Sequence, residues 1–296
     1  MIAFIIFTIL VLTVYCIYQM LAKLKQQPIT KLTLQEKIKF AITGILAFFS
    51  DVIGLGSFAV NIALLKYFKL VEDAELPIMC NGAQIIPGTL ASLFFLQAIQ
   101  VDVVMLATLV LGASIGGILG GSIVTRLSQQ KIRLAMIVAF AGMILLVGLK
   151  QLGFIPENGQ LLVLGPWQLA LGFFMLIICG SLTSVGIGLF GQVQAVLFLL
   201  GVSPIAAFPI MTAAGAMQQP LTTLIFLKHD KIPLKKALLL SLFGCIGVLI
   251  GLPVVSHLSP YWLHNLLLCV MLYNLISIGL AYWRKKQPVP AILQAH

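Results

Sequence analysis

The sequence predicts an all-α polytopic membrane protein of two inverted repeats, each a glycine-broken re-entrant hairpin followed by three transmembrane helices, with an extra N-terminal transmembrane helix. Three observations predict it. The 296 residues are 60% hydrophobic and 9% charged, with a mean hydropathy of +1.11, whereas soluble domains carry about 25% charged residues. Glycines and prolines recur at one spacing in the two halves. Basic residues lie almost entirely between apolar stretches, as expected for cytoplasmic loops.

Residues 1–39 are predicted to form the extra transmembrane helix and a basic loop. The apolar stretch 1–22 has no basic residue before it, and five lysines follow between positions 23 and 39. A cleaved signal peptide would need a basic start and a small-residue cleavage site, so we expect a retained helix with its N-terminus outside the cell. The net charge of +10 therefore indicates cytoplasmic loops beside anionic lipid headgroups, and not a nucleic-acid partner.

The remainder of the chain repeats an internal pattern. Glycine and proline mark helix breaks and close packing, so positions shared by the two halves indicate a duplicated fold. A shift of 132 residues, reduced to 131 after a one-residue gap, superposes such positions: Gly54 on Gly186, Gly56 on Gly188, Pro77 on Pro209 and Gly116 on Gly247. The predicted division is a first repeat at 40–152, a linker at 153–166, a second repeat at 167–283 and a tail at 284–296.

Each repeat contains one broken and three continuous apolar segments. Continuous segments of about 20 residues can cross a hydrocarbon core of about 30 Å. Six are expected: 76–96, 103–125, 134–150, 204–227, 237–255 and 262–283. The broken segments are 40–65, interrupted at 53–57, and 167–200, interrupted at 185–191. Their pieces of about 10–14 residues are too short to cross and suit re-entrant hairpins.

Loop charges favour this topology. If both broken segments crossed once, the lysines and arginines would divide 13 to 5 between the two sides. If both enter and return, they divide 17 to 1, with only Lys150 on the minority side, which obeys the positive-inside rule better. Each repeat then has three crossings, so the repeats are inverted and their hairpins enter from opposite faces. The C-terminus is then cytoplasmic, and the membrane is the plasma or inner membrane of the cell.

The two broken segments also predict a solute site near the middle of the membrane. A helix start exposes unpaired N–H groups and partial positive charge, so two facing starts bind an anion without a basic side chain. For any single residue, the alternative is a helix cap or an interhelical hydrogen bond. The expected substrate-binding residues are glycines of the breaks and polar side chains near them: Gly54, Gly56, Ser57, Asn81, Gln84, Ser184, Gly186, Gly188, Gln192, Thr212, Gln218 and Gln219.

Asp51 is the one acidic residue deep inside an apolar segment, where a carboxylate is costly. Three roles are open: it exchanges a proton, binds a coupling cation such as sodium, or caps the half-helix after the glycine break. An ionised Asp51 would repel a bound anion. We therefore hypothesise that a proton or a cation neutralises it during part of the transport cycle, which makes Asp51 the predicted ion-coupling residue.

Other patterns are expected to be structural. Gly112, Gly116 and Gly120 are spaced by four residues, which lets helices approach closely, either within one chain or between the two copies of a homodimer. Five cysteines lie in apolar stretches without a CxxC pair and are expected to be small buried hydrophobes. No HExxH, GxSxG or Walker A spacing occurs, so we expect no enzyme activity, no cofactor and no metal.

The glycine and proline motifs carry a family resemblance. In the first half they are IGLGSF at 53–58, PIMCNGAQ at 77–84 and LGASIGGILGG at 111–121; in the second they are VGIGLFG at 185–191, PIMTAAGAMQQP at 209–220 and GCIGVLIG at 244–251. Over residues 40–283 this pattern resembles the TauE/SafE family of sulfite exporter-like permeases. The family's glycine triplet stands here as Gly56-Ser57-Phe58 and Gly188-Leu189-Phe190. The resemblance implies movement of small sulfur-containing or carboxylate anions.

The leading hypothesis is therefore a secondary transporter for a small anion, such as sulfite, a sulfonate or a related organic anion. The alternatives are a membrane scaffold or assembly factor, and a cation-coupled permease for a neutral solute. Without a P-loop, the chain is not an ATP-driven pump of that class. A polar, water-accessible cavity between the two hairpin tips would favour a transporter over a scaffold.

Overall fold

The computed structural model describes residues 2–26, 32–154, 159–229, 232–254 and 260–286. Five helices in these ranges, α1, α4, α5, α7 and α10, are long and apolar enough to cross a membrane. This agrees with the predicted helical membrane protein. The described ranges form eleven helices and no β-strand: α1 (Ile2–Leu24), α2 (Leu34–Val52), α3 (Ser57–Tyr67), α4 (Leu76–Ala98), α5 (Val103–Val124), α6 (Gln129–Gln151), α7 (Pro166–Thr183), α8 (Leu189–Leu199), α9 (Pro204–Lys228), α10 (Leu234–Gly251) and α11 (Pro260–Lys286).

The two broken segments are interrupted where the glycines predicted. Residues 53–56 separate α2 from α3, and residues 184–188 separate α7 from α8. Gly54 has a φ of +96° and Gly186 a φ of +107°, in the left-handed region that glycine adopts without steric cost. The chain can therefore leave one helix and begin the next within four or five residues.

The first helix of each broken pair is longer than the predicted pieces of about 10–14 residues. α2 has 19 residues and α7 has 18, whereas α3 and α8 have 11 each. Thr33 and Glu36 form a capping box, which starts α2 ahead of its apolar stretch. Pro166 occupies the first turn of α7, a favourable position for proline. Counting apolar residues misses such first turns.

The six continuous segments fall on helices, although α10 ends at Gly251, before the predicted end of the segment 237–255; residue 255 lies outside the described residues. α6 begins at Gln129 and α10 at Leu234, earlier than the apolar residues indicated, because polar residues extend the first turns. α4 continues through Pro87, and α9 through Pro209 and Pro220. Since each proline lacks an N–H group, one carbonyl of the preceding turn loses its helical donor at each of these positions.

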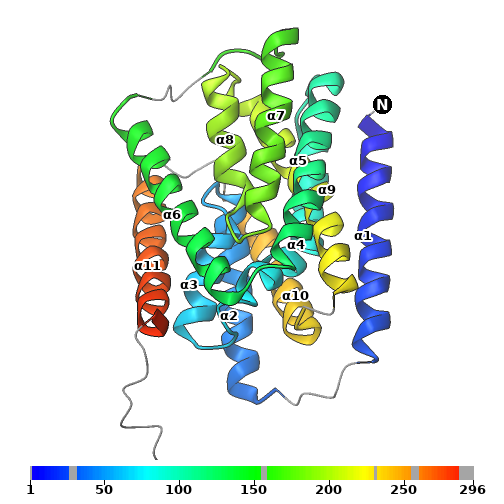
Figure 1. Ribbon diagram of the computed structural model, residues 1–296. Coiled ribbons are helices and arrows are strands. Elements are labelled where there is room, and N and C mark those ends of the chain that lie inside the picture. The colour runs from blue at the N-terminus through cyan, green and yellow to red at the C-terminus, as the bar shows by residue number, and fades with distance from the viewer. Residues whose placement is uncertain (1, 27–31, 155–158, 230–231, 255–259, 287–296) are drawn as a thin grey trace, which may run out of the picture.

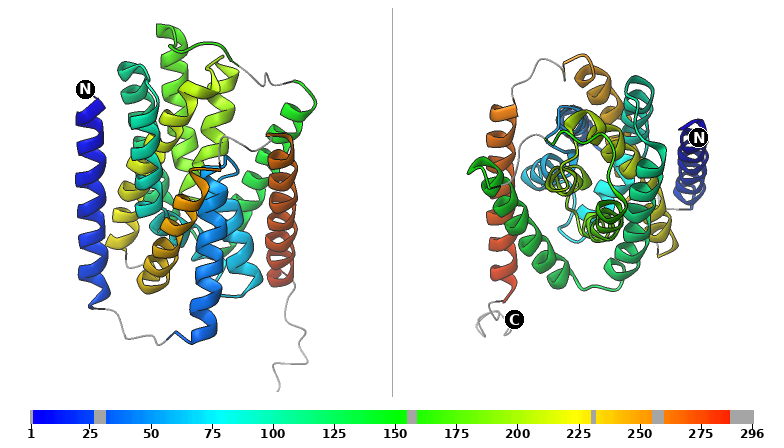
Figure 2. Two further views of the ribbon diagram at one scale, coloured as in Figure 1. Left: turned by 180° about the vertical axis from the view of Figure 1, so that it is seen from behind. Right: turned by 90° about the horizontal axis from the view of Figure 1, so that it is seen from above.

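The two hairpins occupy opposite halves of the molecule (Figure 1). The N-terminal end of α1 lies at the upper end in this view, and α11 ends at the lower end. α2 and α3 lie in the lower half, and α7 and α8 lie in the upper half, so the two helix breaks approach each other near the middle. Figure 2 shows the same arrangement from behind, with α1 on one flank and α11 on the other.

Helices of the two halves pair in matching ways. α5 packs against α7 and α10 packs against α2, while α4 packs against α9 and α6 packs against α11. Counted from α2 and from α7, the fourth helix of each half contacts the first helix of the other. The third and fifth helices contact their own counterparts. α1 stands outside this scheme and packs against α9 and α4.

Glycines make the closest of these contacts. A Cβ added to Gly116 of α5 would lie 2.0 Å from the carbonyl oxygen of Ile177 in α7. In the matching pair, a Cβ added to Gly247 of α10 would lie 2.3 Å from the carbonyl oxygen of Ile45 in α2. Both distances are far shorter than a van der Waals contact, so these helices approach only because glycine is present. The predicted close contact through small residues therefore lies within one chain.

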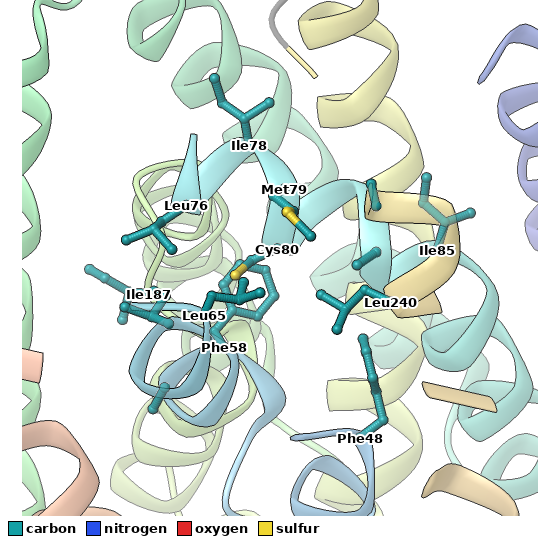
Figure 3. Packing of buried hydrophobic residues seen from close by; sticks show 14 of the residues in the cluster. Phe48, Phe58, Leu65, Leu76, Ile78, Met79, Cys80, Ile85, Ile187 and Leu240 are labelled. Carbon is teal, nitrogen blue, oxygen red and sulfur yellow. The ribbon is translucent and has the colours of Figure 1, made fainter. Parts of the chain in front are cut away.

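Buried apolar side chains fix α3 in place. Figure 3 shows Phe58 and Leu65 of α3 close to Ile187, in the break between α7 and α8, and to Cys80 of α4. These four residues are at most 2% exposed. Within a membrane, such packing stabilises the fold through close van der Waals contact, because lipid tails are as apolar as the core. It holds the first hairpin against both α4 and the opposite break.

Candidate functional site

The two helix breaks contact each other through a reciprocal pair of glycine and phenylalanine residues. A Cβ placed on Gly188 would lie 3.4 Å from the Phe58 Cβ, and one placed on Gly56 would lie 3.8 Å from the Phe190 Cβ. Phe58 and Phe190 are both buried. Each break therefore provides the surface against which the phenylalanine of the other break packs. This contact places the starts of α3 and α8 beside each other in the interior.

Asp51, near the end of α2, caps the start of α3. Its Oδ1 accepts the Ser57 backbone N–H at 2.7 Å, and its Oδ2 accepts the Gln84 side-chain amide at 2.6 Å. The amide oxygen of Gln84 in turn accepts the Ser57 hydroxyl. All three residues are buried. The carboxylate thus takes the position that a bound anion would occupy at this helix start.

The start of α8 has no such carboxylate. Thr183 is the counterpart of Asp51 under the 132-residue shift, and its hydroxyl donates to a carbonyl one turn back in α7. α8 begins after Gly188 without a side-chain cap. The Gln192 amide donates instead to the carbonyl groups of Ile187 and Gly188. The two helix starts are therefore unlike: a carboxylate caps α3, and no side chain caps α8.

A cavity of about 20 Å³, with a lining that is more apolar than polar, lies where the breaks meet α4 and α9. This volume has room for about one water molecule. None of its thirteen lining residues, all within the described ranges, is basic. Hydrogen-bonding groups and helix starts are therefore its polar features. Six of the residues predicted for the site line it: Asp51, Ser57, Gln84, Gly188, Thr212 and Gln219.

The remaining predicted residues lie around the breaks and do not line this cavity. Asn81 joins α4 to the end of α7 by donating to the Thr183 carbonyl oxygen at 3.1 Å. Ser184 joins the second break to α5 by donating to the Gly117 carbonyl oxygen at 3.2 Å. Their contacts connect the hairpins to neighbouring helices or shape the turns. The residues of this set are Gly54, Gly56, Asn81, Ser184, Gly186, Gln192 and Gln218.

Several buried polar atoms lack a hydrogen-bond partner among the described residues. They include both amide atoms of Asn61 and the amide oxygens of Gln192, Gln218 and Gln219. An unsatisfied buried polar group costs about 1–3 kcal/mol, and nearly all such groups in proteins are paired. Because Gln219 lines the cavity, its oxygen offers an acceptor to a water molecule or a solute there.

Sequence reasoning missed the apolar part of the lining. Phe58, Phe190 and Met211 form apolar walls, and Gly88 and Gly215 leave space between them. The shift that aligned the glycines also superposes Phe58 on Phe190, so the repeat itself held a signal for this pair. Gly88 and Gly215 could not be identified from the sequence. The packing of α4 against α9 decides which glycines of these two helices face the cavity.

Among the described residues, no group of three or more His, Cys, Asp or Glu could hold a metal ion. Cys16, Cys80 and Cys179 are buried, but Cys245 is only half-buried and Cys269 is exposed. The expectation that every cysteine is buried was wrong there. A small apolar side chain on a membrane helix can face lipid as well as the core.

Comparisons with known proteins provide no relative for this chain. No protein-family model, no curated protein and no solved structure matches it. The resemblance to the TauE/SafE family therefore stays a prediction from the motifs, and function has to be argued from the site.

Proposed function

We propose that this chain is a secondary transporter for a small anion, which binds between the two helix breaks. The observation that carries the proposal is the cavity at their contact, whose polar lining comes from both halves: Asp51, Ser57 and Gln84 from one and Thr212 and Gln219 from the other. Helix starts beside a cavity that also carries hydrogen-bonding side chains suit an anion. The TauE/SafE resemblance supports sulfite, a sulfonate or a related organic anion as the substrate.

In this proposal the two halves are inverted repeats in a plasma or inner membrane. The hairpins enter from opposite ends of the molecule (Figure 1), and matching helices of the two halves pair; both features occur in transporters with inverted repeats. The lower end in Figure 1 is then cytoplasmic, and the N-terminus is outside. α7 is long enough to cross the membrane alone, but the chain turns back after Thr183 into α8.

Asp51 couples the anion to a proton or a sodium ion. Its carboxylate accepts the Ser57 N–H, so a second negative charge in the cavity is repelled. Protonation of Asp51, or a cation beside it, removes the repulsion and lets the anion accept from Ser57 and from the uncapped start of α8. Loss of the proton or cation restores the carboxylate, which displaces the anion. The start of α3 thus binds either the Asp51 carboxylate or the substrate anion. This exchange links movement of the anion to movement of the proton or cation.

The cavity must enlarge for the substrate to bind. It holds about one water molecule. A second small cavity, lined mainly by apolar residues that include Met143 and Met271, shares Gly188 with it. Movement of either hairpin tip would separate a glycine from its opposing phenylalanine and widen the polar space. Because the tips come from opposite ends of the molecule, each movement would open a path toward a different face.

The carboxylate also favours a second candidate, a cation-coupled permease for a neutral solute. A cavity with a buried Asp51 and no basic lining residue accepts a cation and a neutral polar molecule without repulsion. The two candidates differ in what must bind: an anion in one case, a neutral solute with a cation in the other. A scaffold would bind neither.

Thermal unfolding of the purified protein tests the site. The panel consists of sulfite, thiosulfate, sulfoacetate, taurine and simple carboxylates, at acidic and at neutral pH. A true ligand at 100 times its Kd stabilises the fold by about 2.7 kcal/mol. Thr212→Val should reduce this stabilisation, because Thr212 lines the cavity.

Thr43→Val is the matched control. The hydroxyls of Thr43 and Thr212 both donate to a carbonyl one turn back, at 2.8 and 3.0 Å, and both residues are buried, but Thr43 does not line the cavity. If Thr43→Val and Thr212→Val lower the stabilisation by an anion to the same extent, this site is rejected. Stabilisation by neutral solutes with sodium, and by no anion, would select the second candidate.

Asp51→Asn tests the coupling. The substitution keeps an oxygen for the Ser57 N–H but removes the ionisable group, so substrate binding should remain and gradient-driven accumulation should be lost. Uptake and efflux in proteoliposomes with an imposed proton or sodium gradient measure both. Ser50→Ala is the control, because the neighbouring Ser50 hydroxyl bonds only within α2. If Asp51→Asn keeps the gradient dependence of the wild type, Asp51 is a helix cap and the coupling mechanism has to be dropped.

A further inference from the structure

A second and larger pocket is lined by residues of α3, α6 and α11, and these helices reach the lower end of the molecule in Figure 1. It has a volume of about 750 Å³. The end of α3, the loop that leads to α4, the start of α6 and residues 273–281 of α11 form its walls. One wall carries Lys66, Lys69 and Arg133, and the α11 wall carries Ile276 and Leu280. The pocket is thus basic on one side and apolar on the other.

Arg133 is the buried member of the basic wall. It is 7% exposed, and its Nε and Nη2 both approach Asp73 Oδ2, at 2.7 and 2.6 Å. Lys66 binds the other carboxylate oxygen of Asp73 at 2.5 Å. The second terminal nitrogen of Arg133, Nη1, has no acceptor among the described residues. One carboxylate therefore does not satisfy all the donors of these two cations. Nη1 is buried, so a ligand with several acceptor oxygens binds it only after the guanidinium turns toward the pocket.

The charge of the pocket also favours an anion. Its lining contains the three cations and two carboxylates, Glu72 and Asp73, a net of one positive charge. Two further lysines lie next to the same loop. The Lys236 ammonium donates to the Leu70 carbonyl oxygen at 2.8 Å, and the Lys39 ammonium lies 5.8 Å from the centre of the Phe68 ring. The charges of both lysines also act on the Glu36 carboxylate, so only part of their positive charge is left for the pocket.

The apolar wall indicates which kind of anion fits. Tyr273, Ile276 and Leu280 of α11 are 39%, 60% and 54% exposed, and all three line the pocket. A soluble anion would use the basic wall alone. A phospholipid presents a phosphate beside long acyl chains, so it can use both walls at once. Basic pockets between membrane helices at the cytoplasmic side bind anionic lipid headgroups in other proteins.

We propose that this pocket binds the phosphate group of an anionic phospholipid, with an acyl chain along α11. Arg133 and Lys66 lie at the inner end of the basic wall, and Lys69 is exposed at its rim. The site requires no assumption about the solute that the helix breaks bind. It would tie α3, which belongs to the first hairpin, to α11 through a lipid molecule.

Titration of the purified protein in neutral detergent tests the proposal. Short-chain phosphatidylglycerol, short-chain phosphatidylcholine and glycerol phosphate are compared by native mass spectrometry and by thermal unfolding. Phosphatidylglycerol should bind most tightly. Lys69→Gln should weaken it about fivefold, the effect of one basic residue near an anionic lipid surface. Lys25→Gln, an exposed lysine at the same end outside the pocket, should change nothing.

Two further variants separate the walls. Arg133→Lys keeps a cation for Asp73 but removes the forked guanidinium, so it should weaken phosphatidylglycerol binding without unfolding the lipid-free protein. Ile276→Asn should weaken binding of the lipid and leave glycerol phosphate unchanged. If glycerol phosphate binds the pocket as tightly as phosphatidylglycerol, the lipid assignment is overturned and the pocket is a site for phosphate groups alone. Equal binding of phosphatidylglycerol and phosphatidylcholine, or equal losses in Lys25→Gln and Lys69→Gln, would overturn the site itself.

Discussion

The Asp51 carboxylate bridges the first helix break by accepting the N–H of Ser57. From the sequence alone, three roles were open for this residue: a cap, a proton carrier and a cation ligand. Ion coupling was the predicted one. The contact with Ser57 could be predicted from the sequence, because the two residues are only six positions apart, on either side of the glycine break. The contact with Gln84 was not, since the rotation of α4 toward α2 depends on how α4 packs against α9 and α10. Capping is observed, and ion coupling stays a prediction.

Asp73 gives a prediction about acid stability. Burial raises the pKa of its carboxyl, but the hydrogen bonds and charges of Lys66 and then Arg133 outweigh burial and lower the pKa below its ordinary value of 3.8. A lowered folded-state pKa adds stability above the ordinary pKa, and this stability is lost as the pH falls through the lower folded value. The wild type should therefore lose melting temperature as the pH drops from about 5 toward 3.

Asp73→Asn should be less stable than the wild type at neutral pH and should lack this acid-dependent loss. The expected cost lies between the about 1 kcal/mol of exposed ion pairs and the about 3–5 kcal/mol of buried ones, because the carboxylate side chain is 11% exposed. Melting curves in detergent over a pH series measure it. Glu72→Gln, an exposed neighbour, is the control. Parallel pH profiles for wild type and Asp73→Asn would contradict the assignment.

At the scale of helices, glycine decides which pairs come closest. The contact of α5 with α7 and the contact of α10 with α2 both bring a glycine against the backbone of the partner helix. The four-residue spacing predicted that α5 packs closely, but it could not name α7 as the partner. Small residues permit close approach to any helix, and the choice among helices depends on the packing of the whole bundle.

Gly116→Leu should therefore disrupt folding without altering substrate choice. Even the first added carbon would lie 2.0 Å from the Ile177 carbonyl oxygen, so the helices must separate. Overpacking of this kind costs typically about 1–3 kcal/mol, and occasionally more. Expression level and melting temperature in detergent measure the effect. Gly142→Leu is the matched control, because an added Cβ there has no atom within 4 Å; equal stability of the two variants would remove the packing argument.

Helix boundaries were partly readable from the sequence. The breaks were located correctly, because a glycine with positive φ interrupts a helix locally. The start of α2 was placed too late, although Thr33 and Glu36 have the spacing of a capping box. Hydrophobic length was given more weight than this polar signal. The start of α7 is set by Pro166 and by the hydrogen bond from the Gly165 N–H group to Gln168. In the sequence, this combination is a weaker signal of a helix start than the capping box.

For the whole molecule, the positive-inside division remains the strongest argument about orientation. In the re-entrant arrangement, 17 of the 18 lysines and arginines fall on one side. The structure puts the end of α1, the start of α2 and the end of α11 at the same end (Figure 1). The proposed crossing order rests on charge and length, which are sequence properties, and it stays a prediction. The cavity and its small volume could not be predicted, because they depend on side chains that meet across the two halves.

Cysteine labelling tests this orientation in a background without the five native cysteines. Glu72→Cys and Ser128→Cys should both react with an impermeant reagent only from the cytoplasmic side, and Gln160→Cys only from outside. All three positions are exposed, so access to the membrane side decides the reaction. Right-side-out and inverted vesicles provide the two measurements. Lys25→Cys, an exposed position in the basic loop that follows α1, supplies the reference side. Reaction of both Glu72→Cys and Ser128→Cys from the side opposite Lys25→Cys would mean that the first broken segment crosses the membrane.

The glycine and phenylalanine contact between the breaks also bears on how the chain is made. Gly188 lies 130 residues after Phe58, against which it packs. At a synthesis rate of about 5–20 residues per second, Phe58 waits roughly 7–26 s on the ribosome-bound chain for this partner. Asp51 finds Gln84 only 33 residues later. The nascent protein therefore shields its costly charge early, while the apolar tip of its first hairpin stays uncovered until the second half has been inserted.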